Sequence, residues 1–139
     1  MSQDNLRPFS GIRSFLFVPG NHPDKLAKVF TYGADAVILD LEDACADADK
    51  VEARQTVIDV LKKPHDGKGY VRVNAIDTPY CFRDLDAVIG PWLDGIVLPK
   101  LECHEELYAV DWAISEYEKE RELPFGSIDL MPIIETAKG

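Results

Sequence analysis

Five apolar runs alternate with longer segments of helical character, and this alternation limits the chain to very few folds. Each run is short, and polar or turn-forming residues follow it directly. A continuous apolar run is typical of a strand that is covered on both faces. Strands that alternate with helices form a parallel sheet, so the sequence predicts an α/β protein. The runs are Phe15–Val18, Ala36–Leu41, Tyr70–Val73, Ile96–Leu98 and Ile128–Ile134.

Four helices are predicted between these runs from apolar residues at three- and four-residue spacing. The first begins near Asn21–Asp24, where a cap residue precedes a proline, and ends at Gly33. The second follows the loop 43–49, and the longest extends from Cys103 to Arg121. The residues expected to face the core are Leu26, Val29 and Phe30; Val51, Val57, Ile58 and Leu61; Leu85, Val88 and Ile89; and Leu107, Val110, Ile114 and Tyr117.

Two parallel architectures suit this order of elements. An open sheet of the flavodoxin type suits the length, but it would normally close with a helix after its last strand. A TIM (β/α)₈ barrel typically has about 250 residues, so three further strands would be absent here. We expect the N-terminal portion of such a barrel, with about five βα units in one partial domain, residues 1–139, and a lead-in arm at residues 1–12.

The charge of the chain excludes some classes of partner. The formal net charge is −10, and a field of that sign repels nucleic acid and favours cations. No apolar run approaches the roughly 18 residues that a membrane span needs. The N-terminus lacks a basic-then-apolar signal pattern, so we expect a cytoplasmic protein without a membrane partner. The cysteines are widely spaced and form neither a disulfide framework nor a metal pair; they are Cys45, Cys81 and Cys103.

Glu135 directly follows the last apolar run, Met131–Ile134. A carboxylate at the end of a buried strand must be compensated by a cation or by hydrogen-bond donors. One interpretation is a metal ligand, and Mg²⁺ is the natural ion because it prefers carboxylate oxygens and keeps several waters. The other interpretation is a structural carboxylate that accepts hydrogen bonds from nearby backbone.

An acidic cluster ends the second run. Asp40 and Glu42 share one face of the strand by alternation, and Asp43 belongs to the loop. These acids could hold metal-bound waters or orient an arginine of the next strand. The other interpretation is a solvated loop with one salt bridge.

Arg72 lies inside the third run and needs an anionic partner there. Its planar guanidinium suits a substrate carboxylate. An ion pair with Glu42 or Asp43 is the alternative, and the two roles are compatible. Lys100 ends the fourth run. A Schiff-base lysine is one interpretation of this position, but the acidic cluster favours a metal mechanism.

Taken together, five motifs in this order resemble the HpcH/HpaI aldolase/citrate lyase family, and most of all its citrate lyase β-subunit-like branch. They extend over nearly the whole chain from Arg13. The motifs are Arg13-Ser-Phe-Leu-Phe-Val-Pro-Gly-Asn21, Gly33-Ala-Asp-Ala-Val-Ile-Leu-Asp-Leu-Glu-Asp-Ala44, Val71-Arg-Val-Asn74, Gly95-Ile-Val-Leu-Pro-Lys100 and Ile133-Ile-Glu-Thr-Ala-Lys-Gly139.

The resemblance implies a magnesium-dependent (β/α)₈ lyase that cleaves C–C bonds in 3-hydroxyacyl thioesters of CoA or an acyl carrier protein. Citryl, malyl and citramalyl thioesters would be the substrates, and a 2-oxo acid and an acyl thioester the products. It also implies a cytoplasmic homo-oligomer, trimer or hexamer. Negative charge develops on the thioester enolate during this retro-Claisen cleavage, and Mg²⁺ and Arg72 suit its stabilisation.

The resemblance assigns roles to individual residues. Glu135 would be a metal ligand beside the substrate, and Arg72 would grip the oxo-acid or thioester oxygens. Glu42 and Asp43 would hold metal-bound waters, whereas Phe17 and Lys28 would contact the CoA portion, although the family has a tyrosine at the position of Phe17. The second metal carboxylate of the family is an aspartate expected beyond Gly139.

Two other functions remain open at this point. A flavodoxin-like receiver domain has the right length and an acidic magnesium pocket, but it needs a phosphorylatable aspartate at the end of its third strand. That strand ends here at Arg72-Val-Asn74. A catalytically incomplete binding fragment is the other alternative.

Overall fold

The computed structural model describes residues 11–139, so the predicted N-terminal arm lies outside the described residues up to residue 10. Five parallel strands form one sheet in the order β1-β2-β3-β4-β5. Their bounds are β1 Phe15–Pro19, β2 Ala36–Asp40, β3 Lys68–Arg72, β4 Gly95–Leu98 and β5 Asp129–Pro132. All five apolar runs of the sequence thus form strands.

The strand order decides between the two predicted architectures. A flavodoxin-type sheet has the order 2-1-3-4-5, because its chain reverses direction after the first unit. In this protein each strand pairs with the next one along the chain, as in a (β/α)₈ barrel. Right-handed connections then place every helix on the same face of the sheet. The flavodoxin-type alternative is therefore wrong, and the receiver-domain interpretation loses its structural basis.

The helices between the strands differ from the prediction at two places. The expected first helix is divided into α1, Pro23–Leu26, and the 3₁₀ helix η2, Val29–Tyr32, which ends at Gly33 with a φ of 75°. A short 3₁₀ helix, η3 Asp47–Asp49, precedes α2, Lys50–Leu61. Val51 in α2 is 66% exposed and does not face the core, because Lys50 and Ala53 lie on the buried side. The remaining helices are α3 Cys81–Val88 and α4 His104–Glu120.

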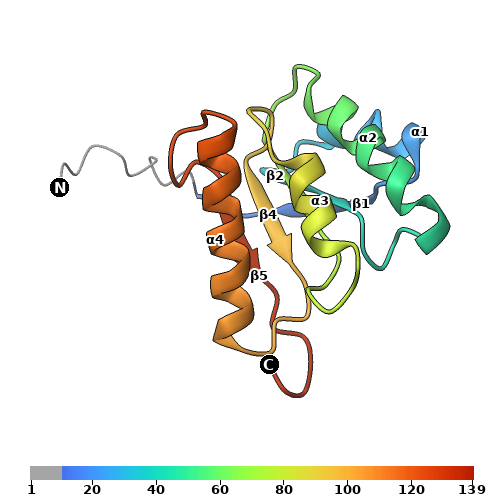
Figure 1. The fold of residues 1–139 in the computed structure, drawn as a ribbon. Helices are drawn as coiled ribbons and strands as arrows, with labels where there is room; N and C mark the ends of the chain where they lie inside the picture. Colours follow the sequence, from blue (N-terminus) through green and yellow to red (C-terminus); the bar gives the residue numbers. More distant parts are fainter. Residues whose placement is uncertain (1–10) are drawn as a thin grey trace.

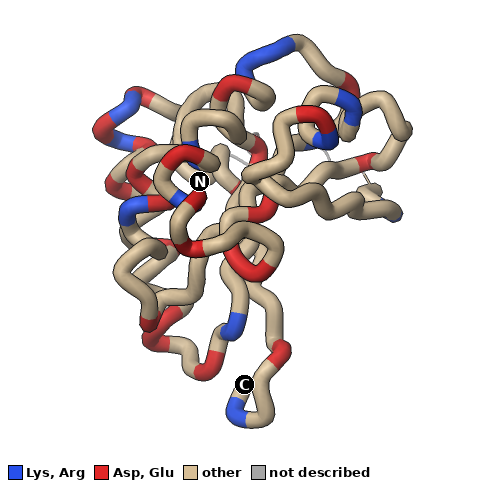
Figure 2. The backbone as a smooth tube through the Cα atoms, turned by 90° about the vertical axis from the view of Figure 1, so that its right-hand side faces the viewer, with Lys and Arg blue, Asp and Glu red and all other residues tan. Residues whose placement is uncertain are grey.

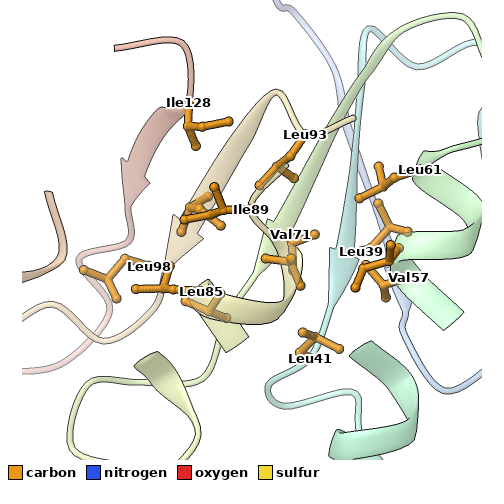
Figure 3. Close-up of a cluster of buried hydrophobic side chains, with 14 of the residues drawn as sticks. Leu39, Leu41, Val57, Leu61, Val71, Leu85, Ile89, Leu93, Leu98 and Ile128 are labelled. Atoms are coloured by element: carbon orange, nitrogen blue, oxygen red, sulfur yellow. The ribbon is translucent and has the colours of Figure 1, made fainter. Parts of the chain in front are cut away.

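The main core lies between the sheet and these helices. Alternate strand residues point to the helices, so Leu39 of β2 lies beside Val57 and Leu61 of α2 (Figure 3). Val71 and Leu98 continue the same layer toward α3 and α4. The core residues are almost fully buried, and burial of such side chains contributes about 1.5–3 kcal/mol each.

The opposite face of the sheet carries a second, smaller apolar cluster. Ala36, Ile38, Tyr70 and Val97 are buried there, and Met131 packs against them. In a (β/α)₈ barrel this face points to the barrel interior. Phe15 of β1 lies toward one edge of this face and is 41% exposed.

The chain has more acidic than basic residues, and the acidic residues are not concentrated in one segment. Acidic residues outnumber basic ones, 25 to 15. Within the described residues they occur along the entire backbone (Figure 2). Within residues 11–139, no helix is long and apolar enough to cross a membrane.

Candidate active site

The predicted site residues lie at the carboxyl ends of the strands, which all point to one rim of the sheet. The strand arrows and the C-terminal loop after β5 mark this end of the molecule (Figure 1). Loops at such a rim hold polar groups over a rigid base, so it is the usual place for catalysis in parallel α/β folds. The structure brings five of the predicted residues together there: Glu42, Asp43, Arg72, Lys100 and Glu135.

Arg72 is held by Asp40, its direct neighbour across the β2–β3 pairing. Nε donates to Asp40 Oδ1 and Nη2 donates to Oδ2, both at 2.7 Å. The sequence predicted an ion pair with Glu42 or Asp43, and the pair with Glu42 is present as a second, longer contact. Glu42 Oε2 is a weaker partner at 3.5 Å from Nη1, and Asp43 contacts Lys100 rather than Arg72. Asp40 is the closest partner of Arg72 because its position in register on the neighbouring strand allows a bidentate pair.

Both members of this pair have shifted pKa values. Burial alone would raise the pKa of Asp40, but the hydrogen bonds from Arg72 and from the backbone of Glu42 and Ala44 hold it below its ordinary value. Asp40 in turn raises the pKa of Arg72 against the effect of burial. The pair is therefore charged, and it fixes the plane of the guanidinium.

Glu42 lies between two cations. Its Oε1 accepts a hydrogen bond from Lys100 Nζ, and its Oε2 faces Arg72 Nη1. The Glu42 side chain is only 6% exposed, and Oε2 makes no hydrogen bond within the described residues. A buried carboxylate oxygen without a donor is a strong acceptor for a cation or for a water that a cation holds.

Lys100 connects the loops after β2, β4 and β5. Its Nζ contacts Glu42 and lies 3.1 Å from Asp43 Oδ1, and its backbone N–H donates to Glu135 Oε1 at 3.1 Å. The hydrogen bond to Glu42 is the main cause of a raised pKa of the Lys100 ammonium. A nucleophilic amine needs the neutral form, so this environment disfavours a Schiff-base role.

Glu135 is exposed in the loop after β5. Its carboxylate accepts the backbone N–H of Lys100, which satisfies part of the structural interpretation. The carboxylate has further acceptor capacity, because an ionised carboxylate offers about four lone-pair sites. Glu135 is therefore both anchored and available for a ligand.

A buried polar network lies next to the rim residues. The sequence predicted Asn74 at the rim, and the structure places it in this network with Lys50 and Asp84, which were not predicted. Lys50 Nζ donates to the carbonyls of Leu41 and Glu42 and to Asn74 Oδ1, at 2.7–2.9 Å. Asn74 donates to Asp84, which also binds Arg54 Nε at 2.7 Å. A signal for Asp84 existed, because helical spacing places it with Cys81, Leu85 and Val88. For Lys50 we find no local signal.

Phe17 and Lys28 occupy different surroundings. The Arg72 guanidinium lies over the Phe17 ring at 5.0 Å, and both residues line a cavity of about 270 Å³ together with Asp40. Phe17 is therefore adjacent to the rim residues. Lys28 is exposed between α1 and η2, and no ion pair joins it to the rim in the described part of the chain. A role of either residue in CoA binding stays a prediction.

The donor chemistry of the rim fits a magnesium ion in part. Glu135, Glu42 and Asp43 provide carboxylate oxygens, and Glu42 Oε2 is buried without a hydrogen bond. Mg²⁺ is usually bound through one or two carboxylates and several waters, so a small ligand set is compatible with it. Among residues 11–139, however, no group of three or more His, Cys, Asp or Glu side chains is arranged to hold a metal.

Comparison with known sequences supports the predicted family. The family model described as HpcH/HpaI aldolase/citrate lyase matches residues 13–139. A citrate lyase subunit beta from Leuconostoc mesenteroides subsp. cremoris is 36% identical over 100% of this chain and 45% of its own length. An L-malyl-CoA/beta-methylmalyl-CoA lyase from Cereibacter sphaeroides is 39% identical over 91% of this chain and 41% of its own.

Solved structures agree with this result. The citrate lyase beta subunit from Mycobacterium tuberculosis, complexed with oxaloacetate and magnesium, is 34% identical and has a TM-score of 0.67 over 90% of this chain and 48% of its own. A malate synthase from Haloferax volcanii has a TM-score of 0.77 at 21% identity, over 90% of this chain and 42% of its own, which shows a shared fold alone. These neighbours have a TIM-barrel-like fold, so the fold prediction is confirmed. The chain spans less than half the length of each of these proteins.

Proposed function

The chain belongs to the HpcH/HpaI aldolase/citrate lyase family, and on that premise we propose that its rim is part of the active site of a magnesium-dependent carbon–carbon lyase. The substrates would be 3-hydroxyacyl thioesters such as citryl-, malyl- or citramalyl-CoA, or the corresponding acyl carrier protein thioesters. The products would be a 2-oxo acid and an acyl thioester. The residues of this chain supply one portion of the site.

The observation that carries this proposal is the contact of two cationic side chains with the buried Glu42 carboxylate. Arg72 and Lys100 face its two carboxylate oxygens, and Lys100 reaches Asp43 and Glu135 as well. The loops after β2, β4 and β5, together with Arg72 at the end of β3, thus place two cations and three acids at one rim of the sheet. A site with this balance can hold a divalent cation and an anionic substrate side by side.

Arg72 suits the recognition of the substrate. Arg72 Nε and Nη2 both donate to Asp40, so the plane of the guanidinium is fixed. Nη1 makes no hydrogen bond to another residue within 11–139; its nearest carboxylate oxygen is Glu42 Oε2 at 3.5 Å. Nη1 can therefore donate to a carboxylate or keto oxygen of the substrate without repositioning of the side chain.

The metal would be held by Glu135, with Glu42 and Asp43 binding its waters. When bound, magnesium supplies Lewis-acid polarisation of the substrate oxygens. In the cleavage, the hydroxyl proton of the substrate is removed as the adjacent C–C bond breaks, and the electron pair of that bond passes to the enolate of the departing thioester. A proton returned to the enolate carbon then gives the acyl thioester, so the proton lost from the hydroxyl is balanced. Arg72 stabilises oxyanionic charge in this step through Nη1, because its charge does not depend on pH near neutrality.

The identity of the thioester and its carrier, a cytoplasmic location and a trimeric or hexameric assembly remain predictions. They rest on the resemblance and on composition rather than on contacts within residues 11–139.

Binding of Mn²⁺, a paramagnetic substitute for Mg²⁺, tests the metal site directly. Free Mn²⁺ is measured by electron paramagnetic resonance during titration of the wild-type chain and of Glu135→Gln. We expect the substitution to weaken Mn²⁺ binding by at least about tenfold, since even residues that only orient metal ligands contribute that much. Mg²⁺ should compete with Mn²⁺ for the same site.

Glu116→Gln is the matched control, because it removes the same charge from α4, where Glu116 pairs with Lys119 at 2.7 Å. Its Mn²⁺ affinity should equal that of the wild type. Equal weakening in both variants would mean that only the net charge attracts the ion, and the proposed site would be wrong.

A further inference from the structure

Lys100 is the one described residue that contacts all three rim carboxylates, Glu42, Asp43 and Glu135, and the proposed reaction does not use it. Its ammonium group contacts Glu42 and Asp43, the two acids that are expected to hold metal-bound waters. Its backbone N–H binds the expected metal ligand, Glu135. A single residue thus links every acid of the rim.

The backbone conformation of Lys100 makes this double contact possible. Lys100 has a φ of 53°, in the left-handed region that residues other than glycine rarely adopt. Lys100 follows the buried Pro99, and the neighbouring Leu101 N–H is bound to Ile133 O at 3.2 Å, so the loop is fixed on both sides. The turn directs the backbone N–H to β5 and the side chain across β3 to the β2 loop. A conformation of this kind is retained where the surrounding structure enforces it.

The charge balance at Glu42 gives the ammonium a definite role. The Glu42 side chain is buried, and a buried carboxylate requires a compensating cation. Arg72 is committed to Asp40, so it compensates Glu42 only through the longer 3.5 Å contact. The Lys100 ammonium provides the closer one. A divalent cation held at the same acids would bring a second positive charge to this place.

We infer that the Lys100 ammonium is an internal cation that occupies the Glu42–Asp43 acid pair and is displaced from it when a divalent metal binds. Lys100 is then a positioning residue that sets the metal affinity of the site: it holds the acids in place and lowers the affinity by competition. The side chain is 42% exposed, so it can move into solvent when the metal arrives. This inference rests on the proposed function, because it concerns the same metal site.

Neutral substitutions of Lys100 test the inference through a gain in affinity, which damage to the fold would not produce. Mn²⁺ titrations followed by electron paramagnetic resonance compare the wild type with Lys100→Met and Lys100→Gln. Both variants should bind Mn²⁺ about fivefold more tightly, because a positive charge next to the ion has been removed. Lys100→Arg, which keeps the charge, should stay within about twofold of the wild type.

Lys119→Met is the charge-matched control, since Lys119 pairs with Glu116 in the last turn of α4, away from the rim. Equal tightening in this variant would overturn the inference, because net charge alone would explain it. Unchanged or weaker binding in both neutral Lys100 variants, with wild-type binding that still depends on Glu135, would overturn the inference alone. Absence of Mn²⁺ binding in the wild type and in the variants would overturn the proposed metal site and this inference together.

Discussion

Arg72 and Asp40 lie opposite each other on β3 and β2, and two hydrogen bonds of 2.7 Å join the guanidinium to the carboxylate. The Asp40 side chain is 1% exposed and that of Arg72 is 12% exposed. This pair connects the stability of the sheet with the site, because the same guanidinium that satisfies a buried carboxylate also presents Nη1 at the rim.

Removal of the arginine should therefore destabilise the fold as well as the site. Arg72→Met leaves Asp40 buried without its cation, and we expect the free energy of unfolding to fall by about 3–5 kcal/mol in urea denaturation. Arg13→Met serves as the control, because Arg13 also pairs with an aspartate, Asp35, but its side chain is 85% exposed. The loss of unfolding free energy in this variant should be below about 1 kcal/mol. Similar small losses in both variants would show that the Arg72–Asp40 pair has no structural role.

The buried network below the rim gives a second test within one helix. Asp84 of α3 is fully buried and accepts hydrogen bonds from Arg54 and from Asn74, so Asp84→Ala should cost about 3–5 kcal/mol. Asp86, two residues along the same helix, pairs with Arg121 but its side chain is 64% exposed. Asp86→Ala should cost less than about 1 kcal/mol, measured by thermal unfolding. Equal costs would contradict the network.

Acid unfolding should report on Asp35. Hydrogen bonds from the backbone and side chain of Arg13, with a further one from Ser14, lower the pKa of Asp35 from 3.8 to about 2. Since the folded-state pKa is the lower one, the stabilising effect is complete above pH 3.8 and disappears as the pH falls toward about 2. Asp35→Asn should therefore lose less stability than the wild type in this interval, measured by urea denaturation at a series of pH values. A parallel decline in both proteins would rule out this contribution.

The end of α4 offers a stabilising substitution. Glu122 follows the C-cap residue Arg121 and has a φ of 55°, which glycine adopts without strain. Glu122→Gly should raise the free energy of unfolding by about 1 kcal/mol, seen as a higher melting temperature. Glu120→Gly, at the last residue of α4, should lower it, by at most about 1 kcal/mol. A loss of stability in Glu122→Gly would mean that the left-handed residue causes no strain there.

The fold class could be predicted because apolar runs and helical spacing are local signals in the sequence. Their alternation then indicates a parallel α/β sheet. The apolar runs at Ala36–Leu41 and Ile96–Leu98 identify strands, and the position of the rim follows from the residues at which the runs end. The exposure of Val51 could not be foreseen, because helical spacing alone does not tell which of two adjacent positions a neighbouring helix covers.

The partners within the site were less predictable than its members. The predicted ion pair of Arg72 with Glu42 is present at 3.5 Å, but the closer, bidentate partner is Asp40. Strand register places Asp40 opposite Arg72, and register is set by the whole sheet. The contacts of Lys100 with the three rim carboxylates depend on its left-handed backbone conformation, which no local sequence motif predicts. Lys50 has no sequence signal either, since a buried lysine is specified by distant carbonyl and amide oxygens.

We propose that Glu135 and the rim around it form a magnesium-dependent site for a 2-oxo acid. Saturation-transfer NMR with pyruvate tests it most directly, because pyruvate is a small 2-oxo acid whose methyl protons report binding. The wild-type chain should transfer saturation to pyruvate when Mg²⁺ is present, lose the signal when EDTA removes the metal, and show none in Glu135→Gln. A signal that persists without Mg²⁺ or in Glu135→Gln, or no signal under any condition, would contradict the account.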